Sequence, residues 1–195
     1  NRLRKRFPDC KFTFTNAGAV GAVGPTLAQC RATYRASATW AQDSVNNYLS
    51  MDSAYQGIQL WTVPVTGVYT ILAAGAGNGT SYGTGVVISA TITLNGGEVI
   101  RILCGHSATN WQSGAGGTYV ARGTTLAAST PLVVAGGAGG GIGQSIINAT
   151  TANNGVSAYF GGGSSGHAGD GSIGGAGQPG NGGGGFYSGY VYAGL

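Results

Sequence analysis

Short segments in which apolar and polar side chains alternate recur along most of this chain, and this pattern predicts β-strands. Residues 11–15 (KFTFT) alternate long and small side chains, and residues 57–64 (GIQLWTVP) alternate between two faces until a proline ends the run. Residues 68–73 (VYTILA) follow after a turn at residues 66–67. We therefore expect residues 57–64 and 68–73 to form a hairpin.

The clearest hairpin signal is the sequence Asn95-Gly96-Gly97. Asparagine and glycine accept the positive φ angles of a tight turn, and alternating residues flank this turn at 86–94 and 98–104. The pattern predicts that these two flanking segments pair with each other. Further short strands are expected at residues 117–122, 131–135 and 186–192.

One helix is predicted after residues 24–26 (GPT), because Leu27, Cys30 and Tyr34 then fall on one side of it. Residues 36–56 are polar and irregular, which is typical of a loop. About eight short strands with almost no helix favour an all-β sandwich or jelly roll. The aromatic side chains expected in its core are Trp40, Tyr48 and Trp61.

Glycine dominates residues 136–185, and in one stretch it recurs at every third position. Three residues per turn is the geometry of the polyproline II helix, whose backbone makes no internal hydrogen bonds. Such a backbone must bond to neighbouring segments, because buried N–H and C=O groups cannot stay unpaired. We predict polyglycine II helices that pack side by side and are inserted between the strands of the sandwich. The glycines in register are Gly171, Gly174, Gly177, Gly180 and Gly183.

The composition indicates a folded and weakly charged protein. Among 195 residues, 40 are glycine, 42% are hydrophobic and only 7% are charged. Disordered chains show the opposite balance of charge and hydrophobicity. The chain is therefore long enough, and apolar enough, to bury a core, and its composition is typical of extracellular proteins.

The formal net charge of +4 is concentrated at the N-terminus, where residues 1–11 form a basic arm ahead of one glycine-rich domain at residues 12–195. The rest of the chain is nearly neutral, so it lacks the basic face that a nucleic-acid partner requires. A solvated arm is the simplest interpretation; a processing site or an assembly arm that docks on a neighbouring subunit are the alternatives. The arm's cations beyond the terminus are Arg2, Arg4, Lys5 and Arg6.

Three cysteines and two glycosylation sequons fit an extracellular location. Cys10 and Cys30 are the candidate disulfide pair, which leaves Cys104 unpaired. The sequons begin at Asn78 and Asn148, both in glycine-rich loops where an oligosaccharide would project freely. No apolar run is long enough to span a membrane, and no signal peptide is present, as expected for a mature secreted chain.

Several sequence blocks together resemble a known family. The blocks are FTFTNAG at residues 12–18, GPT at 24–26, QC at 29–30, GIQLWTVP at 57–64, GGTYV at 116–120 and PLVVAGG at 131–137. They are similar to the glycine-rich domain in the extracellular part of the anaplastic lymphoma kinase and leukocyte tyrosine kinase receptors, which recurs in microbial and large algal virus proteins. The resemblance implies a jelly-roll-like sandwich, similar to the tumour necrosis factor fold, that carries polyglycine II helices. The receptors' cytokine binding is not carried over to this chain.

The sequence contains no pattern typical of a catalytic or metal site. His106 and His167 lie far apart without neighbouring ligands, and no carboxylates are paired in a recognisable motif. We therefore predict no enzymatic activity, no metal and no cofactor. The carboxylates are Asp9, Asp43, Asp52, Glu98 and Asp170.

Three aromatic residues are candidates for contact with a ligand or subunit. Trp111 lies between two polar amides in a loop, and Tyr187 and Tyr192 lie near the C-terminus. Exposed aromatic side chains are enriched at interfaces. For the neighbouring Tyr190, packing within the domain is the alternative.

Two functions fit these features. The first is a non-enzymatic extracellular structural subunit that self-assembles into a fibre, appendage or particle coat, with residues 11–15 adding to a neighbour's sheet. The alternative is a virion or cell-surface adhesin, or receptor-binding module, that recognises a glycan or a protein. Neither function requires nucleic acid or insertion into a membrane.

Overall fold

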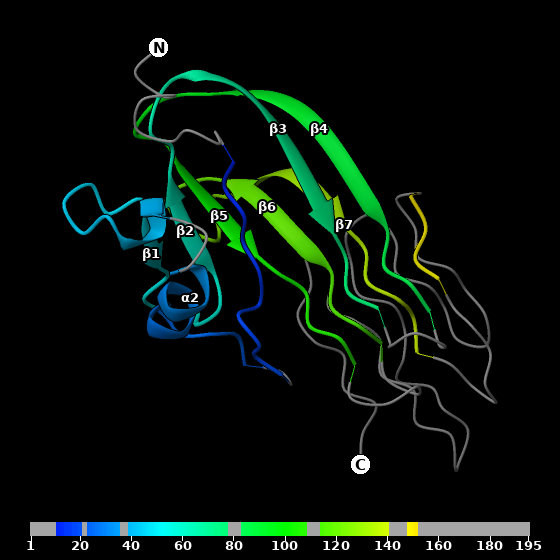
Figure 1. Cartoon of the computed structure of the whole chain (residues 1–195). Helices are drawn as coiled ribbons and strands as arrows, with labels where there is room; N and C mark the ends of the chain where they lie inside the picture. The colour runs from blue at the N-terminus through cyan, green and yellow to red at the C-terminus, as the bar shows by residue number, and fades with distance from the viewer. Residues whose placement is uncertain are drawn as a thin grey trace. The chain divides into compact units, whose positions relative to one another are not determined.

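The protein is described here from a computed structural model, which describes residues 11–20, 23–35, 39–77, 83–108, 114–140 and 148–151 (Figure 1). This part of the chain is mostly β-sheet, which is compatible with the all-β sandwich that the sequence predicts. Its helices are α2 (Leu27–Tyr34) and the 3-10 helix η1 (Thr39–Gln42). Its strands are β1 (Leu49–Met51), β2 (Gln59–Thr62), β3 (Gly67–Ala74), β4 (Val87–Leu94), β5 (Val99–Leu103), β6 (Thr118–Arg122) and β7 (Thr130–Ala135).

The strands form two sheets. One has five strands in the order β1-β2-β5-β6-β7, and the other pairs β3 with β4. Strand β2 is antiparallel to both of its neighbours, with Trp61 opposite Leu49 of β1 and opposite Ile100 of β5. One neighbour of β2 is therefore the preceding strand, and the other, β5, comes from a distant part of the sequence.

Both predicted hairpins are wrong, although the turns and most strands are where the sequence places them. Strands β4 and β5 flank the Asn-Gly turn but belong to different sheets, as do β2 and β3. The turn bonds to the end of β2 instead, because Gly97 N–H donates to Val63 C=O at 2.8 Å and Val63 N–H donates to Glu98 C=O at 2.8 Å. Gly97 has φ of 84°, so the conformation expected of the turn is correct while the expected pairing is not.

The chain divides into two compact units. The first unit comprises Asn1–Ile71, Ala90–Cys104 and Val120–Leu132, and the second comprises Leu72–Ser89, Gly105–Tyr119 and Val133–Leu195. Strands β3, β4, β6 and β7 contribute residues to both units. The predicted boundary after residue 11 lies at the edge of the described residues and stays a prediction.

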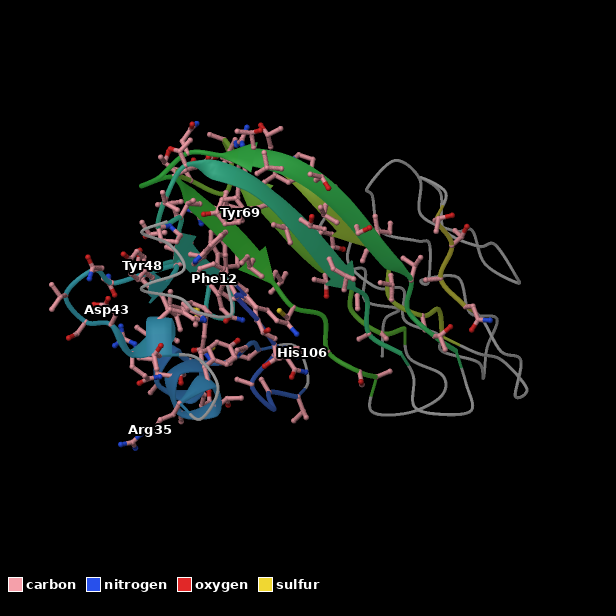
Figure 2. The ribbon with its side chains drawn as sticks, turned by 45° about the horizontal axis from the view of Figure 1, so that its top comes forward. Phe12, Arg35, Asp43, Tyr48, Tyr69 and His106 are labelled. Atoms are coloured by element: carbon pink, nitrogen blue, oxygen red, sulfur yellow. The ribbon has the colours of Figure 1, made fainter. Side chains whose placement is uncertain are left out.

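Aromatic side chains form the core of the first unit. The Phe12 ring lies 4.8 Å from Trp61, and the Phe14 ring lies 5.1 Å from Trp40, measured between ring centroids. Trp40 and Trp61 are each 4% exposed, which confirms their predicted place in the core. Phe12 and Tyr69, both labelled in Figure 2, pack in this cluster through contacts with Trp61.

Residues 11–15 are extended but form no strand, which corrects the prediction. The two phenylalanines at positions 12 and 14 are half-buried while their neighbours are exposed, so the alternation itself is present. The backbone bonds to side chains rather than to a strand, because Thr15 N–H donates to the Tyr34 hydroxyl at 2.8 Å and Gln59 Nε2 donates to Thr15 C=O at 2.8 Å.

Helix α2 confirms the predicted helix. Gln29 N–H donates to Thr26 Oγ1 at 3.2 Å, and Thr26 N–H donates to Gln29 Oε1 at 2.8 Å. This reciprocal pair satisfies two backbone N–H groups at the start of the helix, where no intrahelical partner exists. The buried side of α2 carries Cys30 and Tyr34, as the spacing predicts.

Candidate functional site

The second unit contains a cluster of short glycine-rich segments that bond to one another through the main chain. We call this set the glycine cluster, and its segments are residues 75–77, 83–86, 105–106, 115–117 and 136–138.

The segment at residues 75–77 bonds to three different neighbours in the glycine cluster. Gly75 N–H donates to Val86 C=O at 2.9 Å, and Ala76 N–H donates to Gly116 C=O at 3.0 Å. Ala76 C=O in turn accepts from Ala138 N–H at 2.9 Å. A strand in a flat sheet has at most two bonded neighbours, so this segment lies inside a bundle of main chains.

The other segments of the glycine cluster are joined by further main-chain hydrogen bonds. Val86 N–H donates to Gly136 C=O at 3.0 Å, and Ala115 N–H donates to Ala138 C=O at 2.8 Å. Residues 105–106 join through His106 C=O, which accepts from Gly116 N–H at 2.9 Å. Each segment therefore bonds to at least one other segment of the cluster.

The segments approach so closely that only glycine fits at several positions. A Cβ atom on Gly75 would lie 2.0 Å from the Gly136 oxygen, and a Cβ atom on Gly85 would lie 2.1 Å from the Gly75 oxygen. A Cβ atom on Gly105 would meet the Gly116 oxygen at 2.1 Å. Since real Cβ atoms do not come this near to a carbonyl oxygen, the glycines are required by packing rather than by loop flexibility.

The sequon at Asn148 is held against the glycine cluster. Asn148 Oδ1 accepts from Thr84 N–H at 2.9 Å and from Thr84 Oγ1 at 3.1 Å, and Ala149 N–H donates to Thr84 C=O at 2.9 Å. The Asn148 side chain is exposed. Its Nδ2 atom, the one that would carry a glycan, makes no hydrogen bond within the described ranges. Asn78 lies outside those ranges.

The three carboxylates that the structure describes stabilise loops. Asp43 accepts from Asn46 N–H at 2.9 Å, and Glu98 accepts from Asn95 N–H at 2.9 Å and also pairs with Arg122. Asp52 pairs with Arg101. Within the described part of the chain, no three His, Cys, Asp or Glu side chains gather to hold a metal ion.

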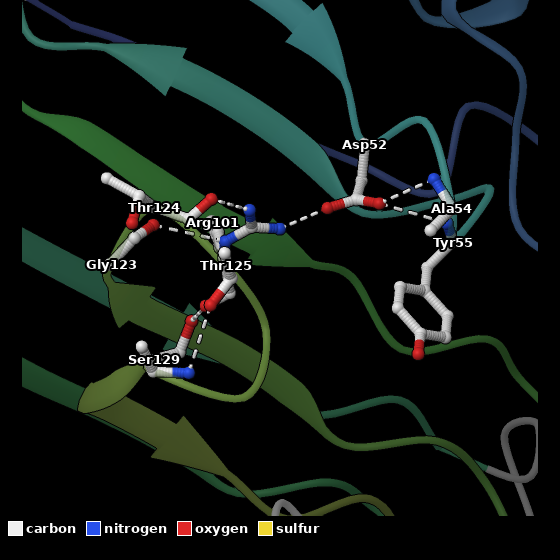
Figure 3. A network of polar contacts seen from close by, with 9 residues as sticks. Asp52, Ala54, Tyr55, Arg101, Gly123, Thr124, Thr125 and Ser129 are labelled. Atoms are coloured by element: carbon white, nitrogen blue, oxygen red, sulfur yellow. Dashed lines mark hydrogen bonds and ion pairs between the residues drawn. The ribbon is translucent and has the colours of Figure 1, made fainter.

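The sequence analysis missed Arg101, which is the buried charge of the first unit. Only 7% of Arg101 is exposed, and its guanidinium pairs with Asp52 while Nε donates to Gly123 C=O at 3.1 Å (Figure 3). A further bond reaches Thr124 C=O. The hydrogen bond from Arg101 holds the pKa of the Asp52 carboxyl below its usual value, and the N–H groups of residues 54 and 55 act in the same direction. The network joins β5 to two loops.

Several residues singled out from the sequence lie outside the described residues, and their roles stay predictions. They are Arg2, Arg4, Lys5, Arg6, Asp9, Cys10, Trp111, His167, Asp170, Gly171, Gly174, Gly177, Gly180, Gly183, Tyr187 and Tyr192. Cys30 is described, and it is a buried free thiol. Its predicted pairing with Cys10 is untested.

Among the described residues, no helix has the length and apolar character needed to cross a membrane.

The described residues form a mostly β-sheet structure whose glycine segments are bonded through their main chains. In comparison with known proteins, the chain is similar to the leukocyte tyrosine kinase receptor of Mus musculus, with 37% identity over 112 residues that cover 54% of this chain. This similarity indicates a relationship to that receptor family. The chain spans 12% of the receptor's length. No family model matches the chain.

Proposed function

We propose that this chain is a non-enzymatic extracellular recognition module, displayed at a cell surface, whose glycine cluster forms a rigid platform for binding a protein or a glycan. The observation that carries the proposal is the main-chain network around residues 75–77, which has three bonded neighbours. The similarity to a protein named as a receptor supports a role in binding. The carboxylates of Asp43, Asp52 and Glu98 each form hydrogen bonds or ion pairs that hold loops in place. This use of the carboxylates supports a role without catalysis.

We infer further that the segments of the glycine cluster are polyglycine II helices. A three-fold helix directs its N–H and C=O groups toward neighbours on several sides, which fits a segment with three bonded neighbours. Among the glycines of the cluster, only Gly83 has a positive φ angle. The others are compatible with the negative φ of a left-handed polyproline-type helix. The same architecture would extend into the glycine tract at residues 136–185.

A rigid glycine bundle suits recognition because it loses little conformational entropy when a partner binds. A surface fixed by main-chain hydrogen bonds is already organised before the partner arrives, so less conformational entropy is lost in the complex. The exposed sequon at Asn148 lies beside this surface, and we propose that Asn148 and Asn78 carry glycans that limit access to it.

The recognition module is favoured over the self-assembling subunit. The assembly hypothesis expected residues 11–15 to be available to a neighbouring subunit, but Phe12 and Phe14 pack against Trp61 and Trp40 of their own chain. No described feature supports a fibre or coat, and an assembly role for the basic arm is untested.

The experiment is a binding screen with the soluble chain, presented as a labelled tetramer to a glycan array and to an array of cell-surface and secreted proteins. We expect saturable binding to one class of target. Gly85→Ala, which disrupts the glycine cluster, should weaken binding by about tenfold or more. Gly67→Ala is the matched control, because a Cβ atom there meets only Tyr69 at 3.8 Å.

Two results would contradict the proposal. One is the absence of any binding above that of the heat-unfolded chain. The other is equal binding by Gly85→Ala and the unchanged chain. Trp111→Ala is tested in parallel. Loss of binding by this variant in its fully folded form would assign the contact to the Trp111 side chain rather than to the platform.

A further inference from the structure

The turn between β4 and β5 places Asn95 directly before Gly96. The side-chain amide of an asparagine can be attacked by the backbone nitrogen of the next residue, and glycine shields that nitrogen least because it carries no Cβ atom. Both residues are exposed to solvent. Neither function discussed above uses this turn.

The side-chain amide of Asn95 is not held in place. The Asn95 backbone N–H donates to Glu98 Oε2 at 2.9 Å, whereas the side-chain amide makes no hydrogen bond within the described part of the chain. Each of the other described asparagines uses its side-chain amide in a hydrogen bond. These are Asn16, Asn46, Asn47 and Asn148. Asn95 is also the only described asparagine that precedes a glycine.

The backbone nitrogen of Gly96 is held by one side chain. Gly96 N–H donates to Oγ1 of Thr66, the residue directly before β3, at 2.9 Å. Attack on the Asn95 side chain requires this N–H to give up its proton and turn toward Asn95, so the bond to Thr66 must break first. The turn also lies close to Thr66, because a Cβ atom on Gly96 would be 3.1 Å from the Thr66 nitrogen. Thr66 therefore opposes the reaction.

We propose that Asn95 is a site of spontaneous deamidation and that the Thr66 hydroxyl sets its rate. The Gly96 nitrogen forms a bond to Asn95 Cγ, the Cγ–Nδ2 bond breaks, and the amino group leaves as ammonia with the proton from Gly96. Water then opens the resulting succinimide ring at one of its two carbonyl carbons. The products are aspartate or isoaspartate, in which the main chain runs through the side chain. One amide and one water thus become one carboxylic acid and one ammonia, so no oxidant or enzyme is needed.

Isoaspartate would disturb the contact between this turn and the end of β2. The turn is closed by Glu98 N–H, which donates to Asn95 C=O at 3.0 Å. Val63, directly after β2, bonds to Gly97 and Glu98 at 2.8 Å each. In isoaspartate the main chain is longer by one methylene group, and the former backbone carbonyl belongs to a carboxylate. The spacing that these bonds require is therefore lost.

The test incubates the full folded chain at physiological pH and temperature in water enriched in heavy oxygen. Proteolytic peptides are sampled over time and fragmented by electron transfer, which distinguishes isoaspartate from aspartate and assigns each change to a residue. This assignment is needed because Asn-Gly pairs also occur at residues 78–79, 154–155 and 181–182, outside the described residues. We expect both products at Asn95, each with one heavy oxygen atom, while the other described asparagines stay unchanged.

Three variants test the role of the Thr66 hydroxyl. Thr66→Val keeps the shape of the side chain and removes the hydroxyl, so Asn95 should convert about fivefold faster, which corresponds to the loss of one hydrogen bond. Thr66→Ser retains the hydroxyl and should keep the rate of the unchanged chain. Thr70→Val is the matched control, because it removes an exposed threonine hydroxyl from β3 that contacts only Thr91. It should leave the rate at Asn95 unchanged.

Two results would overturn the proposal. One is an unmodified Asn95 in the folded chain at a time when Asn95 of the guanidinium-unfolded chain has fully converted. The other is an equal rate in Thr66→Val and the unchanged chain, which would remove the role of Thr66. The first result is read from the unchanged chain and does not depend on how well any variant folds.

Discussion

Among single residues, Arg101 lies in the environment that a charged side chain tolerates least. Its guanidinium is removed from water and is matched by the Asp52 carboxylate and by the Gly123 and Thr124 carbonyl groups. A buried charge is stable only when its donors are satisfied in this way. Arg101 therefore fixes the loops at residues 52–55 and 123–125 to β5.

Replacing Arg101 with leucine should destabilise the protein by about 3–5 kcal/mol, because Asp52 and two carbonyl groups lose their partner. Equilibrium unfolding in urea measures the loss. The matched control is Arg35→Leu, because the exposed Arg35 side chain points away from α2 into solvent (Figure 2). The control should change the free energy of unfolding by less than about 0.5 kcal/mol. Equal losses in the two variants would contradict this account of Arg101.

The same pair should make stability depend on pH on the acid side. The pKa of Asp52 is lower in the folded chain than in the unfolded chain, so its contribution is present above the unfolded value of about 4. The contribution is lost as the pH falls through the folded pKa. The stability difference between the unchanged chain and Arg101→Leu should therefore stay constant above about pH 5 and shrink as the pH falls below about 4 and through the folded pKa of Asp52. A difference that stays constant throughout would show that the Asp52 charge is not involved.

Residue patterns alone revealed part of the site. A motif predicts the sequon at Asn148, and an alternating pattern predicts the buried Trp61; Trp40 was expected to point inward from a loop. Arg101 was missed because it occupies a strand position between two isoleucines, and the sequence does not show which face is buried. Gly75, Gly85 and Gly105 were also missed, since they occur in short separate segments rather than in a run with a period of three.

At the scale of elements, the sequence placed the strands better than it paired them. Strands β4, β6 and β7 agree closely with the predicted ranges, because alternation and turn residues are local signals. Pairing depends on contacts between distant residues, such as Val63 with Gly97, which no local pattern contains. Residues 11–15 failed as a strand for a related reason: the side chains of Tyr34 and Gln59 supply the partners for Thr15.

The glycine cluster makes a prediction at this scale. Gly85→Ala places a methyl group against the Gly75 carbonyl group, so a segment must move and break its main-chain bonds. We expect a loss of about 3 kcal/mol in the free energy of unfolding. Gly67→Ala, in β3, should change it by less than about 0.5 kcal/mol. Thermal and urea unfolding of both variants measure the difference.

The comparison of Gly85→Ala with Gly67→Ala tests the close packing of the glycine segments and does not test the binding function. If Gly85→Ala were as stable as Gly67→Ala, the glycines would be serving flexibility, and the close approach of the segments would not be needed for the fold. A loss at Gly85 with an unchanged circular dichroism spectrum would instead indicate local rearrangement within the second unit.

At the scale of the whole molecule, the high glycine content and the low number of charged side chains account for the reliance on main-chain hydrogen bonds. A chain with 40 glycines and 7% charged residues has few side chains with which to specify a surface. The described segments of the second unit compensate by bonding backbone to backbone, which orders them without large side chains. An organised surface of this kind loses little conformational entropy on binding, which suits the proposed recognition function.

The most direct test of this account is a solution NMR measurement of couplings across hydrogen bonds in the folded chain. The account predicts couplings from the Gly75 amide to the Val86 carbonyl, from the Ala76 amide to the Gly116 carbonyl, and from the Ala138 amide to the Ala76 carbonyl. Detection of all three would establish a segment with three bonded neighbours. Amides that exchange rapidly with water and show none of these couplings would contradict the glycine cluster and the recognition function built on it.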